Sequence, residues 1–367
     1  MISTASSRAG YISLIAAVTV AVLATALLLA ARIQADLAPS LRRLREEVRL
    51  ETAAQSIEAR VAFLLTTEPV GARSIEVGAD RNLDPQAQAV QQNRRYRSAA
   101  GRDINHVGLD GGVYRIDLGA LGLGVSYVAL QDEAGLFNLN AGDEIALREL
   151  LRGSGVSAQS APRLAASLAD FVDSDDLRRA YGAEAREYRR VGLTAPLNDT
   201  LQSAWTALEA FGWRDALSAP ERERIFSLAS GGAPSRTLNI NTAPAPVLEA
   251  ALSLDARMSR VILERRQVTP FASLEEIESL IGARARAESV PLGAAPNGEF
   301  RLNIWLEHTG EASRAVYESL LVVTDSVPAR PVYWRRGQVR RGESDGALFD
   351  GEHEAETLPQ GGAEFPS

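Results

Sequence analysis

The chain contains no cysteine and no lysine among its 367 residues, and it has only three histidines. Without cysteine no disulfide can form, so a domain outside the cytoplasm must depend for its stability on its hydrophobic core or on a bound metal. His106, His308 and His353 lie too far apart in sequence to indicate a zinc site or a catalytic triad. The net charge of -8 and the isoelectric point of about 5.2 disfavour non-specific binding to nucleic acid.

Charge is also absent from residues 11–31, the segment YISLIAAVTVAVLATALLLAA. A helix of this length spans about 30 Å, the thickness of the hydrocarbon core of a bilayer. A secretory signal peptide has a shorter apolar core, of about 7–15 residues, and then a small-residue cleavage site. The following ARIQADL offers no clean site of that kind. We therefore expect a transmembrane segment at residues 11–31.

The residues before this segment form a short polar stretch that carries Arg8 and ends in Gly10. This arrangement resembles the leader of type IV prepilins. The resemblance implies that a prepilin peptidase cuts after Gly10, so that Tyr11 becomes the first mature residue. A plain membrane anchor is the alternative. Charge does not decide the orientation, because further arginines follow the segment between residues 32 and 45.

An amphipathic stem continues the apolar helix. Its apolar residues recur at spacings near three and four, the pattern of one helical face. They are Leu41, Leu44, Val48, Ala54, Ile57, Val61 and Leu64. We expect part of this stripe to pack on the protein's own sheet and part on helices of other subunits. Pro39 should kink or locally break the helix, because proline lacks a backbone donor and clashes with the preceding turn.

Strand patterns flank a long helical region. Residues 113–118 and 125–130 predict two strands, and DEAGLFNLN at 132–140, with its turn signal at Ala134 and Gly135, fits a hairpin. Residues 299–307 and 316–323 predict two more strands, which should complete the same sheet because they would otherwise leave exposed edges. From Gly337 onward the chain is acidic and poor in apolar residues, so we expect disorder there.

The helical region contains a repeat. Asn138-Leu139-Asn140 and Asn239-Ile240-Asn241 each precede a helix, a loop, a second helix and a further helix led by a proline, at Pro196 and Pro270. We interpret the asparagines as N-caps. The large aromatic residues are expected in the core of this domain. They are Trp205, Phe211, Trp213 and Phe271.

Three internal motifs now carry a more specific resemblance. DEAGLFNLN (132–140), DFVDSDDLRRAYGAEAREY (170–188) and LNINTAPAPVL (238–248), behind a prepilin-like leader, together resemble the minor pseudopilin K of the type II secretion system. The likeness covers residues 8–334. Its motif positions are Asp132, Glu133, Gly135, Asn138, Asn140, Asn239 and Asn241.

The resemblance implies an α+β fold. A long pilin-like N-terminal helix packs on an antiparallel sheet, and a large all-helical domain of two similar halves is inserted between strands. The expected parts are a leader (1–10), a transmembrane segment (11–31), the pilin-like helix and first strands (32–140), the inserted domain (141–296), strands that complete the sheet (297–336) and an acidic tail (337–367).

The resemblance further implies a non-enzymatic subunit with a single pass through the inner membrane and its C-terminal domains in the periplasm. The subunit would lie at the tip of the pseudopilus and help to initiate its assembly and protein export. Its partners would be the I- and J-type minor pseudopilins, with the H-type as a further candidate, and prepilin peptidase. A minor pilin of a type IV pilus or a competence system is the alternative.

Ile15 stands at the fifth position after the expected cleavage point, where most pilin-like helices carry a glutamate. A carboxylate there costs about 2.5–3.5 kcal/mol at the centre of the membrane unless it is paired. A tip subunit has no subunit above it to provide the partner, so isoleucine fits that position. Any anchor helix would also have an apolar residue here.

An acidic cluster is the remaining candidate site. Asp173, Asp175, Asp176 and Glu184 place four carboxylates within twelve residues. Calcium accepts about six to eight oxygens in irregular loops, and the resemblance also implies calcium in the helical domain. A solvated acidic loop is the alternative. DNA binding through a helix-hairpin-helix module is disfavoured, because the turn at residues 253–257 has no glycine to let backbone N–H groups approach a phosphate.

Overall fold

The first element of the chain is a single long helix. The computed structural model describes residues 5–77, 106–141, 143–233, 236–281, 291–307, 315–323, 332–341 and 355–359. Helix α1 (Ala5–Thr67) is 63 residues long and contains Pro39. It continues through the proline, so no local break occurs, while a kink stays a prediction. The chain divides into two compact units between Thr52 and Ala53.

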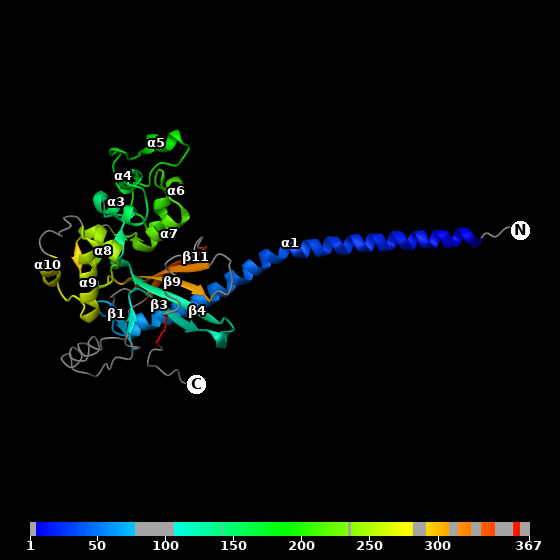
Figure 1. Cartoon of the computed structure of the whole chain (residues 1–367), viewed down its shortest axis with the longest axis horizontal. Helices are drawn as coiled ribbons and strands as arrows, with labels where there is room; N and C mark the ends of the chain where they lie inside the picture. Colours follow the sequence, from blue (N-terminus) through cyan, green and yellow to red (C-terminus); the bar gives the residue numbers. More distant parts are fainter. Residues whose placement is uncertain are drawn as a thin grey trace. The chain divides into compact units, whose positions relative to one another are not determined.

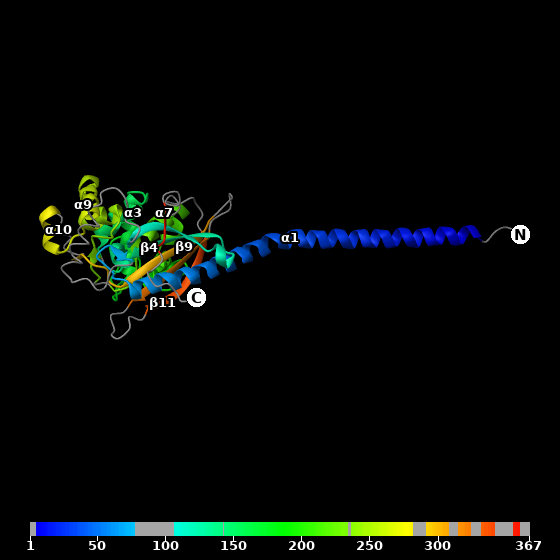
Figure 2. The same ribbon diagram turned by 90° about the horizontal axis from the view of Figure 1, so that it is seen from below.

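The second unit is built on a six-stranded sheet. Its strands, in order across the sheet, are β11 (Val332–Arg341), β10 (Ala315–Val323), β9 (Glu299–Leu306), β4 (Val125–Asp132), β3 (Asp110–Asp117) and β12 (Glu356–Thr357). Neighbours are antiparallel, except that β12 is parallel to β3. The last turns of α1 run along β4 and β9 (Figures 1 and 2), where Ile57, Val61 and Leu64 are buried. This part of the chain is the helix-on-sheet arrangement predicted from the sequence.

Two small elements complete this region. Strands β1 (Ser74–Glu76) and β2 (His106–Gly108) form an antiparallel pair after α1. A 3-10 turn, η1 (Gly119–Leu121), joins β3 to β4, and Gly122 ends it in the left-handed conformation, with φ of 70°. Glycine suits that position because it has no Cβ to clash there.

A large domain is inserted between the adjacent strands β4 and β9 and is drawn from green to yellow in Figure 1. It opens with the 3-10 turn η2 (Glu133–Gly135). Its further helices are α3 (Glu144–Gly153), α4 (Ala161–Val172), α5 (Ala185–Arg190), η3 (Ala204–Glu209), α6 (Trp213–Ala216), α7 (Ala219–Leu228), α8 (Ala245–Leu252), α9 (Ala256–Val268) and α10 (Leu274–Ile281). The predicted insertion between strands is therefore confirmed.

The insertion is not entirely helical, because each half begins with a two-residue strand. β5 (Phe137–Asn138) pairs in parallel with β6 (Ala229–Ser230), and β7 (Leu238–Asn239) pairs in parallel with β8 (Leu292–Gly293). Helix α3 of the first half packs on α8 of the second. Both halves thus share one hydrophobic core.

The aromatic residues of the insertion lie in this core, as predicted. Trp213 and Phe271 are buried, and Trp205 and Phe211 pack against the same cluster. Trp205 contacts Phe226, with ring centroids 4.4 Å apart. The indole nitrogen of Trp213 donates to the carbonyl of Leu164 at 2.9 Å, so this polar group is satisfied inside the core.

Three local expectations are wrong. The 132–140 segment does not form a hairpin with β4, because η2 turns the chain out of the sheet and β5 pairs with β6 instead. No α-helix begins at Pro196; the chain stays irregular up to the 3-10 helix η3. The tail is ordered in two places, since β11 extends to Arg341 and β12 pairs with β3. The residues between these two strands lie outside the described part of the chain.

Candidate functional sites on the stem, the junction and the acidic loop

The apolar stripe of α1 changes its exposure along the helix. In the first unit, Leu41, Leu44 and Val48 are 52%, 56% and 54% exposed. In the second unit, the same stripe continues with Ala54, Ile57, Val61 and Leu64, which are all buried. An aliphatic residue left half in water gains little from the hydrophobic effect. The exposed part of the stripe is therefore a candidate surface for packing against other helices.

The N-terminal part of α1 has the properties of a membrane span. The segment that begins at Leu14 is long and apolar enough to cross a bilayer, and its side chains, including Ile15, are exposed. Gly10 and Tyr11, which flank the expected cleavage point, lie within the helical backbone of α1. Their side chains are outside the described part of the structure, so cleavage there stays a prediction.

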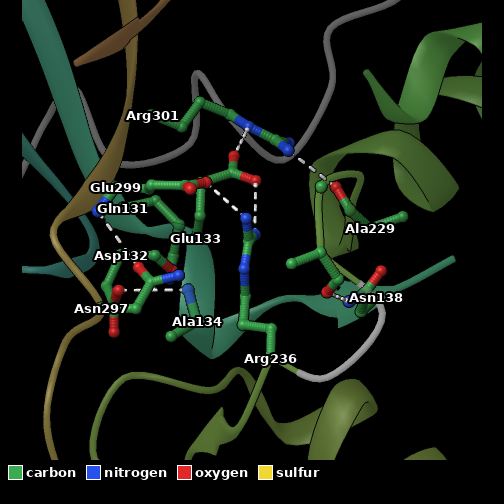
Figure 3. A network of polar contacts seen from close by, with 12 residues as sticks. Gln131, Asp132, Glu133, Ala134, Asn138, Ala229, Arg236, Asn297, Glu299 and Arg301 are labelled. Atoms are coloured by element: carbon green, nitrogen blue, oxygen red, sulfur yellow. Dashed lines mark hydrogen bonds and ion pairs between the residues drawn. The ribbon is translucent and has the colours of Figure 1, made fainter. Parts of the chain in front are cut away.

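The junction between sheet and insertion holds a buried aspartate, Asp132, which lies beside Glu133 and Ala134 (Figure 3). Asp132 ends β4 and caps η2, since its Oδ1 accepts a hydrogen bond from the N–H of Ala134 at 3.1 Å. Its Oδ2 accepts hydrogen bonds from Asn239 Nδ2 and from Thr242 Oγ1, both at 2.8 Å. Burial raises the pKa of Asp132, and these hydrogen bonds oppose the rise.

The next residue, Glu133, connects the sheet to the first half. Arg301 on β9 donates from Nε to Glu133 Oε1 at 2.6 Å, and its two other nitrogens donate to the carbonyls of Phe226 and Ala229, each at 2.7 Å. Arg236 lies 3.7 Å from the other oxygen of Glu133 and also pairs with Glu299. Burial lowers the pKa of the Arg301 guanidinium, but the negative charges of Glu133 and Glu318 and the hydrogen bond to Glu133 together raise it above its usual value.

Gly135 lies in the same turn and allows a close approach. A Cβ at this position would lie 2.5 Å from Thr242 Oγ1 and 2.8 Å from the carbonyl carbon of Thr242. Any side chain would therefore push the turn away from Thr242, which is one of the partners of Asp132. The predicted motif residues Asp132, Glu133 and Gly135 thus meet in one buried contact between sheet and insertion.

The four motif asparagines do not cap helices. Asn140 accepts from the N–H of Leu201 and donates to the carbonyls of Leu201 and Gly232. Asn241 does the same with Phe271 and the carbonyl of Ala294. The N-caps are instead Asp143 for α3 and Pro244 for α8. The N-cap interpretation is therefore wrong, while the equivalence of the two halves holds at the level of single hydrogen bonds.

The remaining two asparagines brace these turns. Asn138 and Asn239 each accept, through Oδ1, from the N–H of the residue two positions later, at 2.9 and 3.0 Å. Their amide groups then differ, because Asn138 donates to the carbonyl of Ala233 and Asn239 donates to Asp132. Only the second half therefore contacts the carboxylate at the end of β4 through its asparagine.

The acidic loop follows α4 and is centred on a residue that the sequence did not single out. Asp170 is fully buried in the last turns of α4 and pairs with Arg179 Nη1 at 2.9 Å. The same nitrogen pairs with Asp173. A Cβ on Gly182 would lie 2.0 Å from Asp170 Oδ2, so the loop closes directly over this carboxylate. Asp170 and Arg179, which lie within the predicted acidic motif, hold the loop together.

The four predicted metal ligands divide into two pairs. Asp175 and Asp176 are exposed, and Asp175 accepts from the N–H of Leu177 at 2.8 Å. Asp173 and Glu184 face inward. Asp173 Oδ1 is buried without a hydrogen-bond partner, whereas the buried Glu184 carboxylate is at the N-cap of α5 and forms a capping box with Glu187. Burial and the charges of the neighbouring aspartates raise the pKa of Glu184 to about 7.

These carboxylates do not form a ready-made metal centre. Within the described ranges, no group of three or more His, Cys, Asp or Glu side chains has a geometry that could hold a metal ion. The donor chemistry nevertheless fits a hard cation, since Asp173 and Glu184 bring buried carboxyl oxygens close to Asp170. In the structure Arg179 supplies the compensating positive charge.

A long N-terminal helix on an antiparallel sheet, with a domain inserted between neighbouring strands, defines a pilin-like protein with a membrane-type anchor helix. Two family models match the chain, at residues 125–211 and 238–295, and both are described as type II secretion system (T2SS), protein K. The matches cover the end of the sheet, the junction and both halves of the insertion. Over these two segments the chain is thus similar to protein K of the type II secretion system, a minor pseudopilin.

Other comparisons add little to this assignment. No curated protein matches the chain. Among solved structures, a chain of the crystal structure of the GspK-GspI-GspJ complex from the enterotoxigenic Escherichia coli Type 2 Secretion System is similar, with 18% identity and a TM-score of 0.44. The match covers 71% of this chain and 93% of that chain.

Proposed function

We propose that this protein is a non-enzymatic subunit at the tip of the periplasmic pseudopilus, anchored by α1 in the inner membrane. There it helps to start pseudopilus assembly and the export of folded proteins across the outer membrane. The observation that carries the proposal is the change of exposure along the apolar stripe of α1. The stripe is buried from Ala54 to Leu64 in the second unit, and it is about half exposed at Leu41, Leu44 and Val48 in the first. Helices of other pseudopilins would cover the exposed part.

The partners proposed for this stripe are the I- and J-type minor pseudopilins, with the H-type as a further candidate. The similar solved structure is a complex of a GspK chain with GspI and GspJ. The apolar residue Ile15 at the fifth expected mature position suits a subunit with no neighbour above it. A minor pilin of another pilus system is the rival assignment, and it predicts no affinity for these two partners.

Co-purification of the full chain with I- and J-type pseudopilins in detergent tests the proposal. Leu41→Asn, Leu44→Asn and Val48→Asn together should reduce capture at least about tenfold, because loss of one buried interface anchor already costs about 2 kcal/mol. The matched control, Arg42→Gln with Glu46→Gln, changes exposed polar residues of the same helix. Equal capture of both variants, or no capture of the unmodified chain, would contradict the proposed contact.

We also propose that the acidic loop binds calcium, with Asp173 and Glu184 as inner ligands and Asp175 and Asp176 as outer ones. The support is the buried Asp173 Oδ1, which has no hydrogen-bond partner, together with the buried carboxylate of Glu184, whose contact is the capping box of α5. A bound cation would supply positive charge among carboxylates that otherwise repel one another. Calcium would keep Asp173 and Glu184 ionised and would draw the exposed aspartates toward the loop.

Thermal melting of the full chain with calcium and with chelator tests this site. At a hundredfold excess over its dissociation constant, calcium should stabilise the domain by about 2.7 kcal/mol. Asp173→Asn with Glu184→Gln should abolish the shift, whereas Glu264→Ala, a change at an exposed acidic residue of α9, should preserve it. A melting temperature that does not respond to calcium would indicate an ordinary acidic loop, with Arg179 as its counterion.

A further inference from the structure

The C-terminal segment 355–359 clips around the edge strand β3. Strand β12 pairs in parallel with β3, with Glu356 opposite Tyr114 and Thr357 opposite Arg115. The N–H of Leu358 then donates to the carbonyl of Arg115 at 2.9 Å. Through these main-chain contacts the segment becomes the last strand of the sheet, next to β3.

The two ends of this segment make contacts of different kinds. Ala355 packs against the apolar cluster that contains the stacked rings of Tyr127 and Trp305. Leu358 is only 1% exposed, and its carbonyl accepts a hydrogen bond from Arg60 of α1 at 2.7 Å. The segment therefore touches the sheet and the stem helix within a few residues.

The position of β12 in the sheet would not be expected from the order of the strands in the sequence. The preceding strand β11 lies at the opposite edge of the six-stranded sheet, so β12 does not pair with its neighbour in sequence. With strands about 4.8 Å apart, the two edges are separated by roughly 24 Å. The pairing of β12 with β3 at this distant edge indicates a specific attachment, because a solvated acidic tail would leave Leu358 exposed rather than buried.

Arg60 gives the attachment its second feature. An arginine side chain at a helix surface normally keeps its guanidinium in water. Here the guanidinium is partly buried and donates to a main-chain carbonyl of the tail, 298 positions away in sequence. Because the acceptor is a backbone group, the contact requires the segment to be present and in register but does not require a particular side chain at that position.

An open β3 edge would be a template for pairing with another chain. We propose that residues 355–359 are a latch, which closes the β3 edge against strand addition and fastens the end of the stem helix to the sheet. The occupant of the edge is the chain's own C-terminal segment. When the latch is released, the edge accepts an extended strand from a second copy of the chain.

The absence of cysteine in the chain permits a direct test of the latch in the full-length protein in detergent. Arg115→Cys with Thr357→Cys places two thiols at paired positions of β3 and β12, within the distance that a disulfide bridges. The control pair, Thr357→Cys with Tyr317→Cys, uses a residue of β10, four places across the sheet from β12. The first pair should cross-link within one molecule under mild oxidation, and the control should not.

A second measurement tests what the latch does. Removal of residues 355–367 should raise hydrogen exchange of the amides of β3 at least tenfold and should produce dimers on size-exclusion chromatography with light scattering. Arg60→Gln, which keeps the tail, should also raise hydrogen exchange of the β3 amides, but by less than the truncation does. The proposal is overturned if the paired cysteines fail to cross-link, if they do so only between molecules, or if truncation leaves both exchange in β3 and the monomeric state unchanged.

Discussion

Replacement of Arg301 by leucine is the sharpest test of the junction. Arg301 is 8% exposed and makes three hydrogen bonds, to Glu133 at 2.6 Å and to the carbonyls of Phe226 and Ala229 at 2.7 Å. Leucine would leave Glu133 buried, with Arg236 at 3.7 Å as its remaining partner, and would remove the donors of two carbonyls. Loss of one partner of a buried ion pair costs about 3–5 kcal/mol.

Urea unfolding of the full chain, followed by tryptophan fluorescence, measures this loss. Trp213 lies in the core of the insertion and Trp305 lies on β9, so the signal reports both parts that Arg301 connects. The control is Arg152→Ala, which removes an exposed pair with Glu149 at 3.4 Å and should change stability by about 0–1 kcal/mol. Glu133→Leu combined with Arg301→Leu should recover part of the loss, because no unpaired charge then remains. If Arg301→Leu costs no more than Arg152→Ala, the junction is not held by this ion pair.

Three further predictions concern the turn, the leader and the acidic loop. Gly135→Ala should destabilise the chain by about 1–3 kcal/mol through its clash with Thr242, whereas Gly153→Ala, where a Cβ meets nothing within 4 Å, should be near neutral, as compared by thermal melting. Intact-mass analysis of membrane-purified protein should show a chain that begins at Tyr11, and a chain that retains residue 1 would contradict the prepilin leader. Without calcium, Glu184 holds its proton more tightly in the folded chain, at a pKa of about 7 against 4.5 unfolded, so its contribution to stability should fall as the pH rises across that interval. Glu184→Gln should remove this fall in pH-dependent urea unfolding, and an identical pH profile for both proteins would refute the burial of the carboxylate.

Patterns of periodicity were sufficient to predict the layout of the fold. The alternation in residues 299–307 correctly predicted a strand that returns to the sheet, because β9 pairs with β4 across the whole insertion. The repeated Asn-apolar-Asn triplets correctly indicated two similar halves. The role of the asparagines could not be predicted. Asn140 forms hydrogen bonds with residues 61 and 92 positions away, and no local sequence feature distinguishes this role from that of an N-cap.

The parts that sequence reasoning missed depend on contacts between distant segments. Arg301 occupies the position of an exposed polar residue in an alternating strand, yet the insertion covers it. Asp170 precedes the predicted cluster by three residues, and its helical spacing to Asp173 was the signal that could have found it. The two-residue strand β12 gives no periodic pattern at all, so only the pairing with β3 identifies it.

Two consecutive residues at the end of β4 attach both halves of the insertion to the sheet. Asp132 reaches the second half through Asn239 and Thr242, and Glu133 reaches the first half through Arg301 and its backbone acceptors. Because the halves also share one core, neither can shift on the sheet without breaking a buried, charged hydrogen bond. The sheet in turn rests on the buried part of the α1 stripe. Sheet, junction and insertion are thus joined directly, because β4 ends at Asp132 and η2 begins at the next residue.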